Sequence, residues 1–126
     1  MSKFHAVVWM DHQEAHVLQF DPESVEAARV KARSHHPRHH GPDAKALAEF
    51  YNHVAQALAG VHEVLVVGPG AAHDEFHAHC SKHVPAVAKA IVASQKADHP
   101  TDAQLVALAR QYFNKYDRMA GTPTPM

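Results

Sequence analysis

The run Glu63–Gly68, EVLVVG, constrains the fold of this chain more than any other stretch. Val64–Val67 is apolar throughout, and Gly60 and Gly68 bound the run. A short continuous apolar run of this kind is typical of a strand that is buried on both faces. The sequence therefore points to an α/β protein in which helices cover a sheet.

Other stretches predict the remaining strands. His5–Met10 and Ala15–Phe20 are apolar and flank the polar Asp11–Glu14, a pattern that predicts a hairpin. The looser alternation of Val25–Arg33 predicts a third strand beside this hairpin, and Ala90–Ala93 is a candidate short strand. With the run at Glu63, these strands form one mixed sheet.

Three stretches predict helices. Ala44–Leu58 follows Pro42–Asp43, has apolar residues at helical spacing, and places Gly60 where a helix C-cap belongs. Ala71–His83 also predicts a helix. Thr101–Tyr116 is strongly periodic, and Thr101 is suited to the N-cap position. The predicted order is three strands, helix, strand, helix, short strand and helix.

Length and composition limit the organisation of the protein. Its 126 residues suffice for one domain with one core. The 12 Lys and Arg balance 13 Asp and Glu, so no overall basic field indicates a nucleic-acid partner, although 14 histidines make the charge depend on pH. Cys80 is the one cysteine, and the sequence shows neither a signal segment nor an apolar span of about 18 residues. We expect a cytoplasmic protein without a membrane partner.

A basic segment follows the third predicted strand. It combines three fixed cations with four imidazoles around one proline, without an acid, and its members are Lys31, Arg33, His35, His36, Arg38, His39 and His40. Such side chains contact phosphates, and imidazole and guanidinium planes stack on unpaired bases. Contact with RNA, a solvated loop without a partner and a metal site are the three interpretations that the residues leave open.

Metal ligands are also available on the predicted helix Ala71–His83. His73 and His77 are one turn apart and Cys80 follows three residues later, which is a spacing that would hold zinc or nickel. His79 and His83 form a second pair on a neighbouring face. The chain has neither a CxxC pair nor an HExxH motif beside them, and exposed histidines with Cys80 as a small core residue are the other interpretation.

The sequence predicts no catalytic residues. Asp11, Asp98 and Asp102 would have to cluster around metal ions for nuclease chemistry, whereas Asp11 suits a hairpin turn and Asp102 suits the first turn of a helix. Cys80 has histidines nearby only because histidines are so frequent. The stretch GPGAAH after Val67 lacks the spacing of a phosphate-binding loop and predicts a tight strand-to-helix turn.

A family resemblance emerges from these stretches together. The opening VVWMDHQEAHVLQF, the segment EVLVVGPGAAHDEFHAH and above all DHPTDAQLVALARQYF resemble the small bacterial proteins labelled translational machinery proteins. These are similar to the central domain of archaeal and eukaryotic peptide-chain release factors and Pelota. The resemblance covers the chain from about residue 4 to residue 116, and it implies a single ribonuclease-H-like α/β domain, which we expect over residues 1–119. The terminal sequence AGTPTPM itself predicts a disordered tail over residues 120–126.

The resemblance also implies a function. In release factors the loop between the third strand and the first long helix carries Gly-Gly-Gln, and here Ser34–Pro42 takes that place without any glutamine. Peptidyl-tRNA hydrolysis is therefore not implied. The expectation is a translation-associated protein that docks its basic loop on rRNA or tRNA of the ribosome, with no cofactor and no DNA partner. The alternative is a histidine-rich metal-binding protein.

Overall fold

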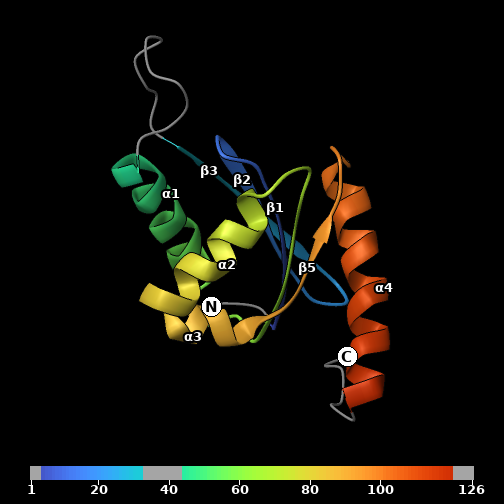
Figure 1. Ribbon diagram of the computed structural model, residues 1–126. Coiled ribbons are helices and arrows are strands. Elements are labelled where there is room, and N and C mark those ends of the chain that lie inside the picture. Colours follow the sequence, from blue (N-terminus) through green and yellow to red (C-terminus); the bar gives the residue numbers. More distant parts are fainter. Residues whose placement is uncertain (1–3, 33–43, 121–126) are drawn as a thin grey trace.

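The computed structural model describes residues 4–32 and 44–120 and contains one five-stranded sheet (Figure 1). The strand order is β3-β2-β1-β4-β5. The strands are β1 (His5–Met10), β2 (Glu14–Phe20), β3 (Val25–Lys31), β4 (Glu63–Gly68) and β5 (Ile91–Lys96). β2 is antiparallel to β1 and β3, whereas β4 is parallel to β1 and β5 is parallel to β4. The single mixed sheet with its helices confirms the predicted single-domain α/β class.

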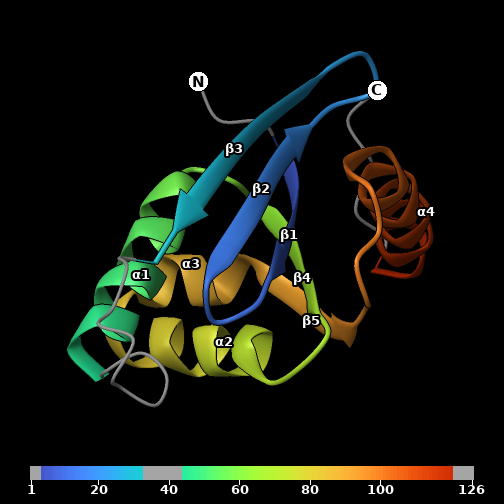
Figure 2. The same ribbon diagram turned by 90° about the horizontal axis from the view of Figure 1, so that it is seen from above.

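Two layers of helices enclose the sheet. The helices are α1 (Ala44–Ala57), α2 (Ala72–His83), α3 (Pro85–Ala90) and α4 (Asp102–Ala120). α1, α2 and α3 cover one face, and α4 lies on the other (Figures 1 and 2). None of these helices, over the residues that the structure describes, is long and apolar enough to span a membrane.

The central strands β1 and β4 are buried along their whole length. Their side chains alternate between two separate apolar clusters. Val8 and Val66 pack in the cluster under α1, α2 and α3, whereas Val7 and Leu65 pack in the cluster under α4. The continuous apolar run at Glu63–Gly68 therefore arises because both faces of its strand are covered.

Most predicted elements are confirmed with small shifts at their ends. The hairpin and the helices at residues 44–58, 71–83 and 101–116 are present, and Gly60 after α1 adopts a φ of 86°. The third strand ends at Lys31 within the described residues. α4 extends to Ala120, and the predicted tail beyond it lies outside them.

The region after α2 differs from the prediction. The expected strand Ala90–Ala93 is instead the longer strand β5, and Ala90 is the last residue of the short helix α3. Pro85 occupies the first turn of α3, where its fixed φ and missing N–H are tolerated. The helix was missed because a six-residue segment is too short to show helical periodicity.

Candidate nucleic-acid interface

The basic segment begins at the carboxyl edge of the sheet. β3 is antiparallel to β2 and β2 to β1, so β3 ends at the same edge as the parallel strands β1, β4 and β5. In open α/β sheets, ligands bind outside the carboxyl ends of the strands. Of the predicted RNA-contacting residues, the structure describes Lys31, which is exposed at the end of β3. The others lie outside the described residues, namely Arg33, His35, His36, Arg38, His39 and His40.

The start of the segment is held by the turn between β1 and β2. The amide of Ala32 donates to the carbonyl of Gln13 at 2.8 Å. Asp11 orders this turn, because its Oδ1 accepts hydrogen bonds from the amides of Gln13 and Glu14 at 2.8 and 2.9 Å. Asp11 therefore has the role of a turn residue, as its position between the two strands predicts.

A second link joins this turn to the helices. His12, on the turn, donates from Nε2 to Glu75 of α2 at 2.9 Å. The hydroxyl of Tyr51, on α1, donates to the same carboxylate oxygen at 3.0 Å. Burial, and then the hydrogen bond to Glu75, raise the pKa of Tyr51 well above its ordinary value. The edge from which the basic segment leaves is thus connected to α1 and α2 by specific polar contacts.

The motif DHPTD, residues 98–102, contacts Trp9 on the α4 side of the same edge. The indole Nε1 of Trp9 donates to the carbonyl of Asp98, and the ring of His99 lies 4.6 Å from the Trp9 ring between centroids. Thr101 caps α4: its Oγ1 accepts from the amide of Gln104 at 3.1 Å, and Gln104 Oε1 accepts from the amide of Thr101 at 2.9 Å. This reciprocal pair confirms the predicted N-cap.

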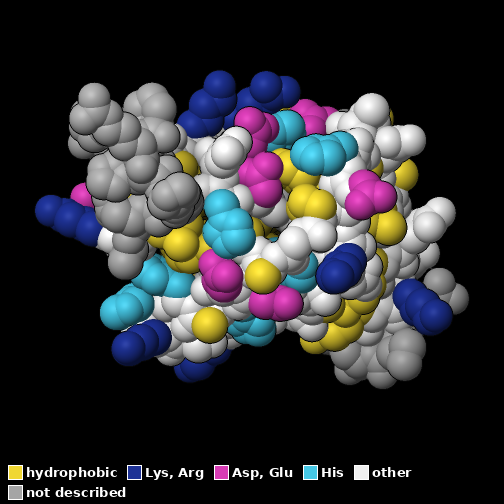
Figure 3. Space-filling model, turned by 45° about the horizontal axis from the view of Figure 1, so that its top comes forward, with side chains coloured by type: hydrophobic (Ala, Val, Ile, Leu, Met, Phe, Trp, Pro, Cys, Tyr) yellow, Lys and Arg dark blue, Asp and Glu magenta, His cyan; other side chains and the backbone are white. Residues whose placement is uncertain are grey.

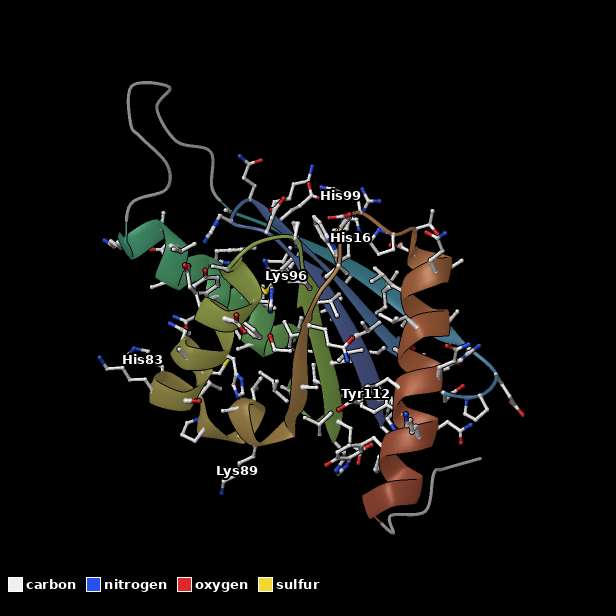
Figure 4. The ribbon with its side chains drawn as sticks, turned by 45° about the vertical axis from the view of Figure 1, so that its right-hand side comes forward. His16, His83, Lys89, Lys96, His99 and Tyr112 are labelled. Carbon is white, nitrogen blue, oxygen red and sulfur yellow. The ribbon has the colours of Figure 1, made fainter. Side chains whose placement is uncertain are left out.

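Asp102 completes the motif through His16 of β2. Nδ1 of His16 lies 3.2 Å from Asp102 Oδ1, and its Nε2 lies 2.7 Å from Glu14 Oε1. His16 therefore joins β2 to the first turn of α4. The rings of His16 and His99 both lie against Trp9, at 5.6 and 4.6 Å between centroids, and Figure 4 labels both near the loop that leads from β5 into α4. The predicted role of Asp102 as a first-turn acid is extended by this contact.

Histidine and acidic side chains are intermixed on the face that Figure 3 shows, and Lys and Arg side chains are spread around them. Most of the imidazoles and carboxylates named above are engaged with one another. Across residues 4–32 and 44–120, no group of three or more His, Cys, Asp or Glu residues is placed to hold a metal ion. Asp11, Asp98 and Asp102 therefore do not form a metal cluster of the kind that nuclease chemistry needs.

The proposed metal ligands of α2 lie in different environments. His73 is 3% exposed, and its Nδ1 bonds Ser94 Oγ, which in turn donates to Asp74 at 2.8 Å. Its Nε2 is buried without a partner among the described side chains. Cys80 is fully buried in the core, and burial raises the pKa of its thiol to about 11. His77 is half-buried, so the three residues are not brought together.

The second histidine pair of α2 is held on the surface. The rings of His79 and His83 are 4.7 Å apart between centroids, and Nε2 of His79 lies 2.8 Å from Asn52 Oδ1. Burial lowers the pKa of His79, and the neighbouring His83 lowers it further. His79 therefore contacts both α1 and His83.

Gly68 makes the turn from β4 into α2, as the stretch GPGAAH predicts. A Cβ atom at this position would lie 2.2 Å from the carbonyl oxygen of Met10 and 3.2 Å from Cδ2 of His73. Glycine is required here because the β1 backbone approaches too closely for any side chain. The first turn of α2 carries Asp74 and Glu75, which disfavour a bound phosphate at this helix start.

Sequence reasoning missed the pairing of His16 with Asp102 and of His12 with Glu75. The partners are 86 and 63 residues apart, so no local pattern joins them. The DHPTD motif was the one available signal. It has more polar residues than a helix cap requires, which indicates that some of them contact other elements.

Comparisons with known proteins place this fold. The sequence matches no protein-family model, and no curated protein matches it. Among solved structures, Pelota from Archaeoglobus fulgidus aligns over 88% of this chain with a TM-score of 0.63 and 16% identity. The archaeal translation termination factor aRF1 aligns over 93% with a TM-score of 0.59 and 16% identity. Dom34 of S. cerevisiae, a translation termination-like factor, aligns over 82% with a TM-score of 0.54 and 12% identity. The chain spans 32%, 39% and 31% of these proteins, respectively.

Proposed function

We propose that this chain is a translation-associated module that binds rRNA or tRNA of the ribosome through the basic segment between β3 and α1. The observation that carries the proposal is the place of this segment. It leaves the carboxyl edge of a domain whose backbone is similar to part of Pelota and aRF1. Membership of the small bacterial family that the sequence resembles stays a prediction.

The charge around the segment supports binding to phosphates. From Ala27 to Pro42 the sequence contains no acid. Arg29 is exposed before the segment, Lys31 is its exposed first member, and Lys45 is exposed after it. The first turn of α1 holds no acid, although Asp43 directly precedes this helix in the sequence. Fixed cations beside a helix N-terminus form a favourable setting for an anionic backbone.

The proposed activity is binding and not hydrolysis. The sequence has no Gly-Gly-Gln, and Ser34–Pro42 contains no glutamine. His12 bonds Glu75, and His16 bonds Glu14 and Asp102. His73 bonds the hydroxyl of Ser94, but that hydroxyl donates to Asp74, so the imidazole does not accept its proton as a general base would. We therefore assign the segment the role of a docking element.

Direct binding to purified tRNA and to rRNA fragments tests the proposal. We expect affinity to fall steeply between 50 and 200 mM salt, because each phosphate contact releases counterions. A variant with His35, His36, Arg38, His39 and His40 changed to alanine should bind at least about tenfold more weakly at low salt and show a smaller salt slope.

A matched control removes the same kinds of charge elsewhere on the surface. It changes the exposed His53, His62, His83 and Lys89, together with the half-buried His77, to alanine, all outside the basic segment. The proposal predicts nearly parental affinity for this control. Absence of RNA binding at low salt, or an equal loss in both variants, would contradict it.

The histidines of the segment predict pH dependence. An ordinary imidazole has a pKa of about 6.5, so the segment gains positive charge between pH 8 and pH 6. At fixed ionic strength we expect tighter RNA binding at pH 6, and this gain should disappear in the segment variant. Equal affinity at both pH values would refute a role for the imidazoles.

A further inference from the structure

β3 forms an open edge of the sheet. It is the last strand in the order, and six of its seven residues are exposed. Its pairing with β2 runs in continuous register from Val25 to Lys31, and the strand contains neither proline nor glycine. Edge strands are usually shortened, bulged or covered, because their free backbone groups pair readily with another chain. Among the described residues, nothing pairs with the outer side of β3.

The backbone groups on this open edge can be assigned. Asp21 bonds Ser24 and Ala32 bonds Gln13 through the backbone, at the two ends of the β2–β3 ladder. Hydrogen-bonded positions alternate along an antiparallel pair. The even-numbered residues of β3 therefore bond β2, and the outward N–H and C=O groups belong to Val25, Ala27, Arg29 and Lys31.

These same residues have side chains on the α4 face of the sheet. They are paired in register with Phe20, Leu18, His16 and Glu14, and Leu18 and Phe20 pack in the α4 cluster. α4 packs on β1 and β2, and Figure 2 shows that it does not extend over β3. Val25 is thus left 44% exposed, one of the two large hydrophobic side chains that are exposed on the described surface.

A groove of about 410 Å³ lies between β3 and α4. Its sheet side is formed by Leu18, Val25 and Ala27. Its helix side presents small residues at successive turns, with Ala103 and Ala107 exposed around Val106, Asp102 at one end and Arg110 at the other. The small side chains leave this face of β3 open to side chains of a further strand added beside it, and the middle of the groove offers them an apolar surface.

Charge on this face favours an acidic partner. Arg29 and Lys31 are exposed on the edge, and within residues 4–32 and 44–120 neither side chain forms an ion pair. The nearby acids are Glu14 of β2 and Asp102 of α4, and both pair with His16. The apolar part of the face lies toward Val25, and the cationic part lies toward Lys31.

We propose that the open edge of β3 and its groove dock an extended segment of a partner protein, which adds to the sheet as another strand. The segment carries apolar side chains opposite Val25 and Ala27 and carboxylates opposite Arg29 and Lys31. Main-chain hydrogen bonds give such strand addition its affinity, and alternate side chains give it specificity. The outward amides and the apolar wall favour a peptide over RNA. The proposal shares Lys31 with the basic segment but does not depend on the residues that follow β3.

The test uses two peptides of opposite direction with ¹⁵N-labelled full-length protein. They are acetyl-Glu-Thr-Glu-Thr-Val-Thr-Val-amide and its reversed sequence, which suit an antiparallel and a parallel added strand. We expect one of them to give saturable shifts, largest at the amides of Val25, Ala27, Arg29 and Lys31. Replacing its two glutamates with lysines should weaken binding at least about tenfold.

Variants separate docking from folding. Ala27→Pro removes an outward N–H and leaves the bonds to β2 intact, a position where an edge strand tolerates proline. The Ala27→Pro variant should give the spectrum of a folded protein and should no longer bind the peptide. Ala103→Glu should weaken binding by placing a carboxylate in the groove, whereas Gln111→Glu adds the same charge on an exposed part of α4 outside it.

Three outcomes would overturn the proposal. One is no saturable shift with either peptide at millimolar concentration. Another is a concentration-dependent shift of the same amides without peptide, because the edge would then pair with a second copy of this chain. The third is that oligouridylate moves these amides and the peptides do not. None of these outcomes decides whether the basic segment binds RNA, because the variants of that segment test RNA binding separately.

Discussion

Cys80 shows how burial settles the chemistry of a single residue. The thiol is fully buried, and burial raises its pKa to about 11, so the reactive thiolate is scarce at neutral pH. We expect labelling by a thiol-specific disulfide reagent at pH 8 to be at least about 100-fold slower in the folded protein than in urea. Fast labelling of the folded protein would place the thiol at the surface and contradict its role in the core.

His79 predicts a pH dependence of stability. Burial and His83 lower its pKa in the folded state, so the unfolded chain binds a proton that the folded chain does not. This difference opens as pH falls through the unfolded value of about 6.5, and it destabilises the fold below that pH. The free energy of unfolding of the variant His79→Gln should therefore fall less between pH 7.5 and pH 5.5 than that of the parent.

Urea unfolding at the two pH values measures this difference. His53→Gln, which changes an exposed histidine of α1, is the control and should follow the parent. If the free energy of unfolding of His79→Gln falls between pH 7.5 and pH 5.5 as much as that of the parent, burial of this imidazole has no effect on stability.

At the scale of elements, the cap of α4 supports the edge that carries the DHPTD motif. Thr101→Ala removes the side-chain acceptor for the amide of Gln104 and should cost about 1 kcal/mol in the free energy of unfolding. Thr101→Ser keeps the hydroxyl and should lose only a few tenths of that value. Equal urea midpoints for the alanine variant and the parent would show that the capping pair contributes nothing.

The turn between β4 and α2 allows a matched pair of glycine substitutions. A Cβ at Gly68 would lie 2.2 Å from the Met10 carbonyl, whereas one at Gly70 would meet no atom within 4 Å. We expect Gly68→Ala to destabilise the protein by about 1–3 kcal/mol, as overpacking does, and Gly70→Ala to be nearly neutral. Similar thermal midpoints for the two variants would contradict the close approach of β1 to this turn.

The sequence predicts the elements of this fold better than it predicts their contacts. Val64–Val67 predicts a central strand because a strand buried on both faces has a continuous apolar sequence. α3 is too short to show a helical pattern. The hydrogen bond from His12 to Glu75 cannot be predicted from a local pattern because the two residues belong to distant elements. Thr101 was predicted since capping is a local interaction, whereas the contact of DHPTD with Trp9 required the tertiary structure.

The whole molecule has two chemically different surfaces at β3. The carboxyl edge leads into a segment of cations and imidazoles, and the α4 face of the same strand presents an apolar groove. Their functions are separable, because variants of the segment leave Val25 and Ala27 unchanged. Binding of RNA and binding of a peptide can therefore be lost independently, and this independence distinguishes the two proposals experimentally.

Sedimentation with ribosomes tests whether the protein docks through its basic segment. The purified protein, the five-residue segment variant and its matched surface control are centrifuged with ribosomes through a sucrose cushion at low and high salt. We expect the parent and the control to pellet with ribosomes at low salt and to be released at high salt, while the segment variant stays in solution. If the parent fails to pellet at any salt concentration, or if the segment variant pellets as well as the parent, docking through the basic segment is wrong.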